Sequence, residues 1–245
     1  MSIQAREIAA AVTSVRATTE RARGLQSVVS GSDGHLAVES PVALALDVVC
    51  EALVARTVRA YFGKAPQAPA ITLLEERRML HAGLTTRSPL LLVDDTTWDE
   101  AVDRALDEAA GTLEACYGKD PASWHWGSAH AIHWRHNLGR DGELAAVLNL
   151  PPMPVGGDGN TPFNTYAERD GKVAVGVSYR QIFDLADLNG ARICIPPGNS
   201  GQPGSPHYAD NIDRWREVEY HPLYINWDDI EANAEARLVL SAAPR

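Results

Sequence analysis

A serine with glycine neighbours is the first pattern in this sequence that could do chemistry. Ser200 stands in the run Gly198-Asn199-Ser200-Gly201-Gln202-Pro203. Small neighbours leave a serine hydroxyl accessible, and a nearby base would make that hydroxyl a nucleophile. Gln202 occupies the place of the last glycine in a Gly-x-Ser-x-Gly elbow, so the run does not fit an α/β-hydrolase. We favour a turn in which Ser200 bonds its own backbone.

The same run is superficially similar to the Gly-Asp-Ser-Gly-Gly-Pro around the nucleophile of trypsin-like proteases. That class needs a helix-poor double barrel, with a histidine and an aspartate preceding the serine in order. The first half of this chain has strong helical periodicity instead. We therefore disfavour the protease alternative.

Four histidines lie close together at His125, His130, His133 and His136. Histidines at such spacings could face one metal ion from a helix. Tryptophans interrupt the run and no acidic residue lies within it, so we favour aromatic packing over a metal site.

A glycine-rich segment, Gly156-Gly157-Asp158-Gly159-Asn160-Thr161, could cradle an anion. It lacks the Gly-x-Gly-x-x-Gly spacing and the Lys-Ser/Thr ending of phosphate-binding loops. We predict a turn that lies close to another stretch of backbone.

Ser2 would become the N-terminal residue if Met1 were removed, and a terminal amine can serve as the base for its own serine. The residues after Ser2 predict a polar helix rather than a buried strand, so we do not assign this role. Gly31-Ser32 could imitate a self-cleavage junction and is better interpreted as a loop.

Composition restricts the class of partner. The chain has 245 residues, a formal net charge of -10 and a pI near 5.2, without a run of lysine or arginine. We expect no binding to nucleic acid or to an anionic membrane surface. The sequence from Met1 to Arg6 lacks the apolar core expected of a secretion signal, and no apolar run approaches the ~20 residues that span a bilayer. Three widely separated cysteines fit neither a disulfide framework nor a metal motif, and we expect them to be buried apolar residues. The alternative is a disulfide between one pair of them in an oxidising compartment.

Helical periodicity dominates residues 1–120, which we treat as a mainly helical segment. We expect helices over residues 6–23, 40–61, 73–84 and 97–118. Ser40-Pro41 supplies an N-cap and a first-turn proline, while Thr97 and Glu100 have the spacing of a capping box.

Residues 121–245 are richer in glycine, proline, aromatic and β-branched residues, and we expect them to be strand-rich. Strands are predicted over residues 172–185 and 191–195, with Asn189-Gly190 as the hairpin turn. The proline-glycine loop of residues 196–208 follows. Ser205-Pro206 is then expected to begin a helix that runs through Trp215, with a short helix from Asp228 and a last strand over residues 237–240.

Several of these segments together resemble the penicillin acylase family. Trp126, Gly127 and His130 match a Trp-Gly-x-x-His signature, and Gly156, Gly157 and Thr161 match a Gly-Gly-x-x-x-Thr turn. The resemblance continues in a Ser-x-Arg strand with a following Asp, which corresponds to Ser178, Arg180 and Asp184. It also includes a Pro-Gly-x-Ser-Gly-x-Pro-x-Ser-Pro-His-Tyr segment, in which the matching residues are Gly198, Ser200, Gly201, Ser205, Pro206, His207 and Tyr208. Departures are mild: Asn199, Asn211 and Asn137 replace other residues of the pattern, and Val218-Glu219 replaces a glycine-containing turn.

The resemblance implies an α+β fold that forms part of an αββα N-terminal-nucleophile hydrolase sandwich, as one incomplete domain of a larger protein. Members hydrolyse linear amides, such as an acyl group on a β-lactam nucleus or on a homoserine lactone, which connects them with antibiotic metabolism. This chain resembles only the C-terminal portion of the large (beta) subunit. The nucleophile and its oxyanion donors would lie upstream, so the resemblance assigns no catalytic residue here and leaves the family-motif residues a structural role.

The resemblance also defines the expected partners. They are the remainder of the acylase, meaning the small subunit and the N-terminal part of the large subunit, and a small-molecule amide. Calcium is implied for some complete members and no cofactor for this chain. Members are often periplasmic or secreted through a precursor signal, which leaves the localisation of this chain unassigned. The alternative is an inactive remnant or a structural or binding subunit. Within the chain, Arg180 and Asp184 are a candidate ion pair.

Overall fold

The computed structural model describes residues 1–64, 71–95, 97–167 and 173–242. The chain divides into two compact units, unit 1 over Met1–Val177 and unit 2 over Ser178–Arg245. The border therefore lies well after the change from helical to strand-rich sequence near residue 120. The mixture of helices and strands confirms the predicted α+β class.

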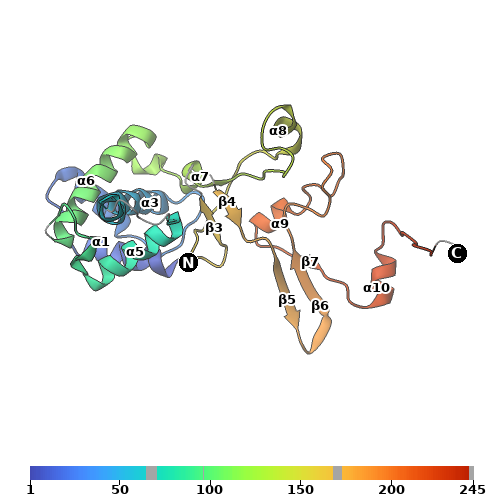
Figure 1. Ribbon diagram of the computed structural model, residues 1–245. Helices are drawn as coiled ribbons and strands as arrows, with labels where there is room; N and C mark the ends of the chain where they lie inside the picture. Colours follow the sequence, from blue (N-terminus) through green and yellow to red (C-terminus); the bar gives the residue numbers. More distant parts are fainter. Residues whose placement is uncertain (65–70, 96, 168–172, 243–245) are drawn as a thin grey trace. The chain divides into compact units, whose positions relative to one another are not determined.

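Unit 1 is built mainly from five long helices, which are drawn in blue to green in Figure 1: α1 (Ile3–Thr13), α2 (Glu20–Val29), α3 (Pro41–Val54), α5 (Leu73–Thr86) and α6 (Trp98–Tyr117). Each begins after a serine or threonine whose hydroxyl accepts a hydrogen bond from the backbone N–H three residues on. The helix starts expected at Ser40 and Thr97 are thus confirmed.

The helix expected over residues 6–23 is wrong, because two helices occupy this stretch. α1 ends at Thr13 and α2 begins at Glu20. The Gln26 amide donates to the Val12 carbonyl at 3.0 Å and to the Val15 carbonyl at 2.6 Å, which adds a side-chain donor to carbonyls at and just after the end of α1. A side chain from α2 thereby stabilises the break.

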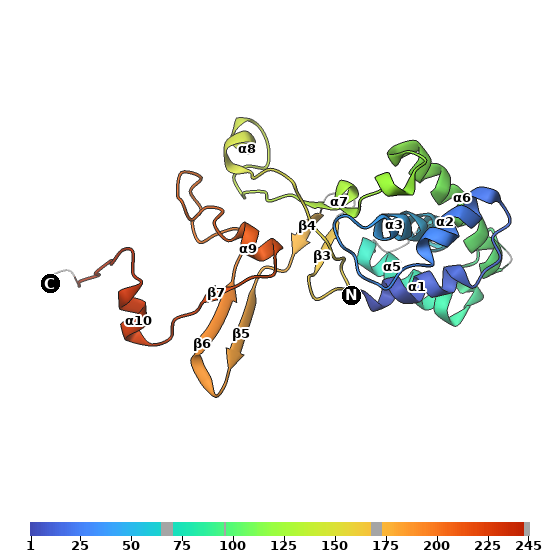
Figure 2. The ribbon, with the colours of Figure 1, turned by 180° about the vertical axis from the view of Figure 1, so that it is seen from behind.

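The core of unit 1 lies between α3 and the helices around it. α3 continues through a π-helical turn (Ala55–Arg59) into α4 (Ala60–Gly63), so the helix expected over residues 40–61 is confirmed with an irregular end. One face of α6 is fully buried against this core, with Trp98, Val102, Leu106, Ala109 and Leu113. Seen from behind (Figure 2), α1 and α5 lie side by side along the same bundle.

A four-stranded sheet in the order β2-β1-β4-β3 completes unit 1. Its strands are β1 (Ala131–Ile132), β2 (Met153–Pro154), β3 (Thr165–Ala167) and β4 (Val173–Gly176), and only the β1–β4 pair is parallel. Shorter helical elements are η2 (Pro89–Leu91), η3 (Pro121–Ser123), α7 (Trp126–Ala129) and α8 (Glu143–Leu148).

Unit 2 contains a three-stranded antiparallel sheet in the order β5-β6-β7, made by β5 (Arg180–Asp184), β6 (Asp187–Cys194) and β7 (His221–Pro222). The strand predicted over 172–185 is therefore two strands, β4 and β5, in different sheets, and its first residue lies outside the described residues. The predicted Asn189-Gly190 turn is wrong: these residues lie in β6 and the chain reverses at Leu185-Ala186.

Aspartates explain where the hairpin turns. The Asp184 carboxylate accepts a hydrogen bond from the Ala186 N–H at 2.9 Å, and the Asp187 carboxylate accepts one from the Asn189 N–H at 3.1 Å. Each aspartate closes a local turn two residues long. The Asp184 turn fixes the reversal at Leu185-Ala186, ahead of the Asn-Gly pair, while the Asp187 bond lies at the start of β6.

The remaining helices of unit 2 are short. α9 (Ile212–Arg216) begins six residues later than the helix expected from Pro206, because Ser205 uses its hydroxyl to accept from the His207 N–H at 3.2 Å and forms only a local turn. α10 (Trp227–Ala232) is close to the helix expected from Asp228. The strand expected over residues 237–240 is wrong, since this segment has no strand pairing and is exposed.

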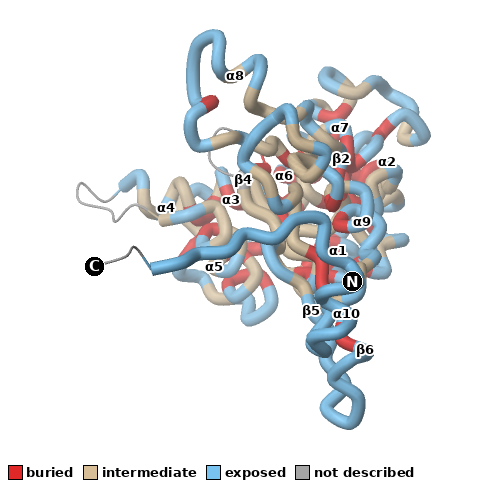
Figure 3. The backbone as a smooth tube through the Cα atoms, turned by 90° about the vertical axis from the view of Figure 1, so that its right-hand side faces the viewer, coloured by how far each residue is buried: buried red, intermediate tan, exposed pale blue. Residues whose placement is uncertain are grey.

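The last part of the described chain is exposed to solvent. In Figure 3 the tube is pale blue from α10 to the last described residues, and residues 224–242 are all exposed. Among the described residues, no helix has the length and apolar character needed to cross a bilayer.

Candidate functional site

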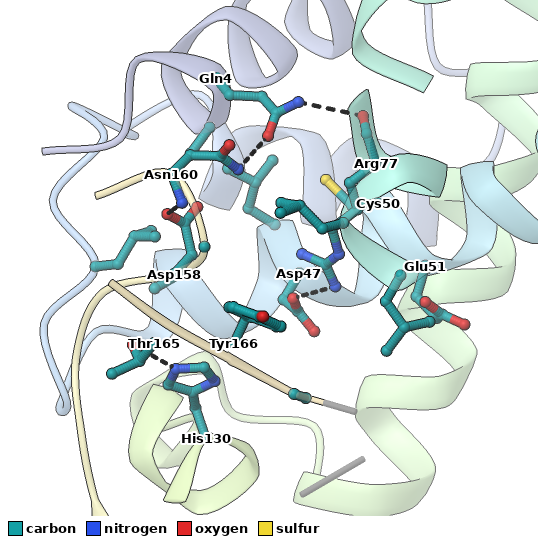
Figure 4. A pocket seen from close by; sticks show the side chains of 18 of the residues that line it. Gln4, Asp47, Cys50, Glu51, Arg77, His130, Asp158, Asn160, Thr165 and Tyr166 are labelled. Atoms are coloured by element: carbon teal, nitrogen blue, oxygen red, sulfur yellow. Dashed lines mark hydrogen bonds and ion pairs between the residues drawn. The ribbon is translucent and has the colours of Figure 1, made fainter. Parts of the chain in front are cut away.

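A cavity of about 610 Å³ lies within unit 1 and is the candidate functional site. Helices α1, α3 and α5 form one wall, and residues 158–167, which lead into and include β3, form the other. Figure 4 shows Asp47 and Cys50 from α3 and Arg77 from α5 opposite Thr165 and Tyr166 of β3. The lining combines apolar side chains with several charged groups.

An ion pair joins the two helices at this wall. Arg77 Nη2 lies 2.6 Å from Asp47 Oδ1, and the two side chains are 30% and 25% exposed. The Asp47 charge raises the pKa of the Arg77 guanidinium above its already high ordinary value. Sequence reasoning missed this pair, although an aspartate inside the apolar run of α3 was a visible signal.

A second charged cluster lies at the edge of the cavity. Arg59 contacts Glu51 and donates to the buried Glu76 at 2.8 Å. The charges are therefore compensated within the wall. Cys50, beside them, is buried, and burial raises the pKa of its thiol to about 12. A thiol with this pKa is a poor nucleophile at neutral pH.

His130 is buried next to the cavity and is held on two sides. Its ring stacks on Trp126 at 4.3 Å, and its Nε2 lies 3.0 Å from the Thr165 hydroxyl. That hydroxyl donates its proton to the Gly156 carbonyl at 2.8 Å, so it accepts from His130 and places the ring proton on Nε2. Burial lowers the pKa of His130 to about 4, which keeps the ring neutral at neutral pH.

The other histidines of the run do not converge with His130. The His125 ring is near the Glu39 carbonyl at 3.4 Å, the His133 N–H donates to the Val173 carbonyl, and the His136 ring accepts from the Leu138 N–H. Across the part of the chain that the structure describes, no group of three histidine, cysteine, aspartate or glutamate side chains could hold a metal ion.

The glycines of two family motifs are needed for close backbone contacts. Gly157 has φ +78° and donates to the Leu36 carbonyl at 2.8 Å, while a Cβ on Gly156 would lie 2.6 Å from the same oxygen. Gly127 donates to the Val38 carbonyl at 2.7 Å. The turn predicted to lie close to another backbone is therefore present, with Thr161 closing it through a 2.7 Å bond to the Phe163 carbonyl.

Ser2 is fully buried and acts as a helix cap. Its hydroxyl accepts from the Ala5 N–H and donates to Asp158 at 3.0 Å, while its own N–H donates to the Gly34 carbonyl at 2.6 Å. These contacts connect the start of α1 to the glycine-rich turn. They give Ser2 a structural role in this chain.

Ser200 lies in unit 2, and its contacts are those of a turn. Its hydroxyl accepts from the Gln202 N–H at 3.1 Å. The neighbouring His207 ring is bonded through Nδ1 to Asp210 and through Nε2 to Glu235, both at 2.8 Å, so neither nitrogen is left to take a proton from Ser200. Serine and histidine are close in sequence without forming a nucleophile and base.

Other residues of the same motif shape this loop. Ser200 N–H donates to the His207 carbonyl, and a Cβ on Gly198 would lie 2.2 Å from that carbonyl oxygen. A Cβ on Gly201 would meet nothing within 4 Å. Pro206 stands inside the local turn that the Tyr208 N–H closes by donating to the Ser205 carbonyl at 3.2 Å.

The expected Arg180–Asp184 ion pair is not formed. Arg180 donates to the Trp215 carbonyl at 2.7 Å and lies over the Tyr220 ring at 5.3 Å, whereas Asp184 closes the hairpin turn. Four residues of extended strand separate the two backbone positions by about 13 Å. Ser178, just before β5, is exposed, and of the three cysteines only Cys116 departs from the expected burial.

The chain belongs to the penicillin amidase family, whose sequence model matches residues 1–232. It is 35% identical over 141 residues to "Penicillin acylase 2 proenzyme" of Pseudomonas sp. (strain SE83), a match that covers 56% of this chain and 17% of that protein. It is 28% identical over 144 residues to "Acyl-homoserine lactone acylase QuiP" of Pseudomonas syringae pv. syringae (strain B728a), with the same coverage of 56% and 17%. Among solved structures, a thermostable penicillin G acylase from Alcaligenes faecalis matches 98% of this chain and 46% of its own with 16% identity and a TM-score of 0.49.

This chain is much shorter than the curated proteins it matches. It spans about 17% of the two curated proteins it matches. Whatever those proteins do as wholes, this chain corresponds to a small part of them.

Proposed function

We propose that this chain is the C-terminal portion of a penicillin-acylase-like amidase and acts together with the remainder of that enzyme. The observation that supports this most directly is the pairing of a family match over residues 1–232 with relatives about six times longer than their matched segments. A chain that carries one part of a family's sequence can supply only that part of its chemistry.

The reaction of the assembled enzyme would be hydrolysis of a linear amide. The names of the relatives support two kinds of substrate, an acylated β-lactam nucleus and an acyl-homoserine lactone. A serine at the terminus of the missing part would attack the amide carbonyl with its own α-amine as base, and backbone and amide donors would stabilise the oxyanion. Neither group is assigned to this chain.

The side chains described above support a scaffold role. Ser2 caps a helix, Ser200 closes a turn, and the thiol of Cys50 is protonated at neutral pH. His130 is neutral and has its Nε2 proton bonded to Thr165. These residues hold the fold rather than form a nucleophile with an adjacent base.

Exposed apolar side chains in unit 2 support the need for a partner. Leu185 is 89% exposed at the β5–β6 turn, Trp227 is 68% exposed on α10, and Leu238 and Leu240 are 83% and 86% exposed. Leu238, Val239 and Leu240 are a continuous run of exposed apolar side chains, and contiguous apolar surface is typical of an interaction site. We assign it to contact with the remainder of the acylase.

Calcium, which the family resemblance implies for some complete members, is not placed on this chain. Among the described residues, no group of three or more histidine, cysteine, aspartate or glutamate side chains could hold an ion.

Co-expression tests the proposal. The probe is penicillin acylase 2 of strain SE83 from which the segment matching this chain has been removed, produced with and without residues 1–245. The readout is turnover of a chromogenic phenylacetyl or long-chain acyl amide. Turnover by the pair and by neither part alone supports the proposal; a stable but inactive pair favours the structural-subunit alternative, and absence of association contradicts the proposal.

A further inference from the structure

One histidine of unit 2 bonds to two carboxylates at once. His207 Nδ1 lies 2.8 Å from Asp210 Oδ2, and its Nε2 lies 2.8 Å from Glu235 Oε2. An ionised carboxylate only accepts hydrogen bonds, so both ring nitrogens must carry a proton to donate to these two groups. Asp210 comes from the same loop and Glu235 from the C-terminal segment, and their hydrogen bonds raise the pKa of His207. The arrangement is that of the positively charged imidazolium.

The bond to Asp210 is local and is fixed by the loop itself. Asp210 is three residues from His207, and its Oδ1 lies close to Gly198, where a Cβ would be only 2.7 Å from it. The Ser200 N–H donates to the His207 carbonyl at 3.0 Å and holds the two arms of the loop together. We therefore expect Asp210 to stay beside the ring whether or not the ring is charged.

The bond to Glu235 reaches a segment that has few other attachments. Residues 224–242 are all exposed, and the other hydrogen bonds that the structure gives to the described residues of this segment join residues within it. The Glu235 side chain is 77% exposed and lies 28 residues from His207 in the chain. It also lies beyond residue 232, the last residue that the family model matches. The bond is thus a polar attachment of this segment to the rest of unit 2 that the family match does not include.

Loss of one proton from the ring would remove one of the two bonds. A neutral imidazole has one N–H and one acceptor nitrogen, and an acceptor nitrogen has no hydrogen to give to a carboxylate. Because Asp210 is fixed by the loop and Glu235 is not, the bond to Glu235 is the one that we expect to break.

We propose that His207 is a pH-sensitive latch, whose imidazolium holds the C-terminal segment of residues 224–242 to the proline-glycine loop and whose deprotonation releases the segment. The segment carries the exposed side chains of Trp227, Leu238 and Leu240. The latch would set the pH range in which these apolar side chains are held in place for contact with the remainder of the acylase. That consequence rests on the proposed function, whereas the latch itself does not.

Trypsin cleavage after Arg237 tests the latch, because this arginine lies inside the segment. Release of residues 238–245 from the full chain is followed by mass spectrometry at pH 6 and pH 9. His207→Gln removes the charge, and the matched control His81→Gln removes the histidine of the His81–Glu7 pair in unit 1. At pH 6 we expect His207→Gln to release the peptide about two- to fivefold faster than the unsubstituted chain, as for an exposed ion pair. At pH 9 the two rates should be equal, and His81→Gln should match the unsubstituted chain at both pH values.

The reciprocal effect on the proton gives a second measurement. If the segment is held by the charged ring, loss of the segment's carboxylate must make the ring easier to deprotonate. NMR titration of the full chain should show that Glu235→Gln lowers the pKa of His207 by about 0.2–0.7. The control Glu231→Gln, on the same segment but bonded to Arg237, should leave this pKa unchanged.

Three results would overturn the latch: equal peptide release by His207→Gln and the unsubstituted chain at pH 6, a difference between them that persists at pH 9, or a His207 pKa that Glu235→Gln does not change. Both measurements use the isolated chain. Failure of the latch is therefore distinguished from failure of the proposed function, which the co-expression experiment tests.

Discussion

The ion pair between Asp47 and Arg77 offers a quantitative test of how the cavity wall is held. Its atoms lie 2.6 Å apart and its side chains are 25% and 30% exposed, between the surface and the interior. An exposed pair contributes about 0–1 kcal/mol, and loss of one partner from a buried pair costs about 3–5 kcal/mol. We therefore expect Asp47→Asn to lower the free energy of unfolding of unit 1 by about 2 kcal/mol.

The assay is thermal and urea unfolding followed by circular dichroism at helical wavelengths, since the long helices all lie in unit 1. A loss of about 2 kcal/mol corresponds to a Tm decrease of roughly 4–8 °C for a unit of this size. The double variant Asp47→Asn/Arg77→Met should lose less than the sum of the single variants, by about 1–2 kcal/mol of coupling.

The matched control is the exposed pair of Lys64 and Asp94, whose side chains are 62% and 66% exposed. Asp94→Asn should change stability by less than about 0.5 kcal/mol. Additive losses in the Asp47 and Arg77 cycle, with coupling below about 0.3 kcal/mol, would refute the role of the pair.

Three further predictions follow from individual contacts. Gly156→Ala should destabilise unit 1 by about 1–3 kcal/mol in urea unfolding, because the new Cβ would lie 2.6 Å from the Leu36 carbonyl oxygen. The control Gly24→Ala adds a Cβ with nothing within 4 Å in α2 and should stabilise the unit by about 0.5–1 kcal/mol. Equal effects of the two substitutions would contradict the close approach of Gly156 to Leu36. The folded-state pKa of His130 is lowered to about 4 by burial, so its contribution to stability is present above pH 6.5 and is lost as the pH falls from 6.5 towards 4. His130→Gln should flatten the plot of unfolding free energy against pH in this range. An unchanged plot would contradict a buried, neutral His130. The pKa of His207 is raised by hydrogen bonds to Asp210 and Glu235, so its contribution to stability is present below pH 6.5 and is lost as the pH rises through the folded-state pKa. NMR titration should place that pKa above 6.5. A lower value would refute the bonding of the ring to the two carboxylates.

Local patterns predicted the elements whose signals act within a few residues. The Thr97 cap and the apolar face through Leu113 predicted α6 because an N-cap and helical periodicity suffice to define a long surface helix. The same reasoning predicted one helix where α1 and α2 are separate. The interruption between them is held by the Gln26 side chain of α2, which donates to the carbonyls of Val12 and Val15. A contact between elements cannot be read from periodicity.

Competing turn chemistry explains the misplaced hairpin. Asn189-Gly190 is a strong turn signal, but Asp184 closes a turn earlier in the chain, and Asn189 and Gly190 lie in β6. The candidate site was missed for a related reason. Asp47 and Arg77 lie on different helices, and residues 158–167 reach them only through tertiary packing, whereas the glycine turn at Gly156 carried its own local signal.

We propose that this chain carries part of an acylase and not its nucleophile. The most direct measurement is turnover of a chromogenic phenylacetyl or long-chain acyl amide by the purified, isolated chain. The account predicts no turnover, because Ser2 and Ser200 are bound in a helix cap and a turn. Robust turnover that survives Ser2→Ala and Ser200→Ala would contradict it, since the chain would then contain a catalytic group that this structure does not assign.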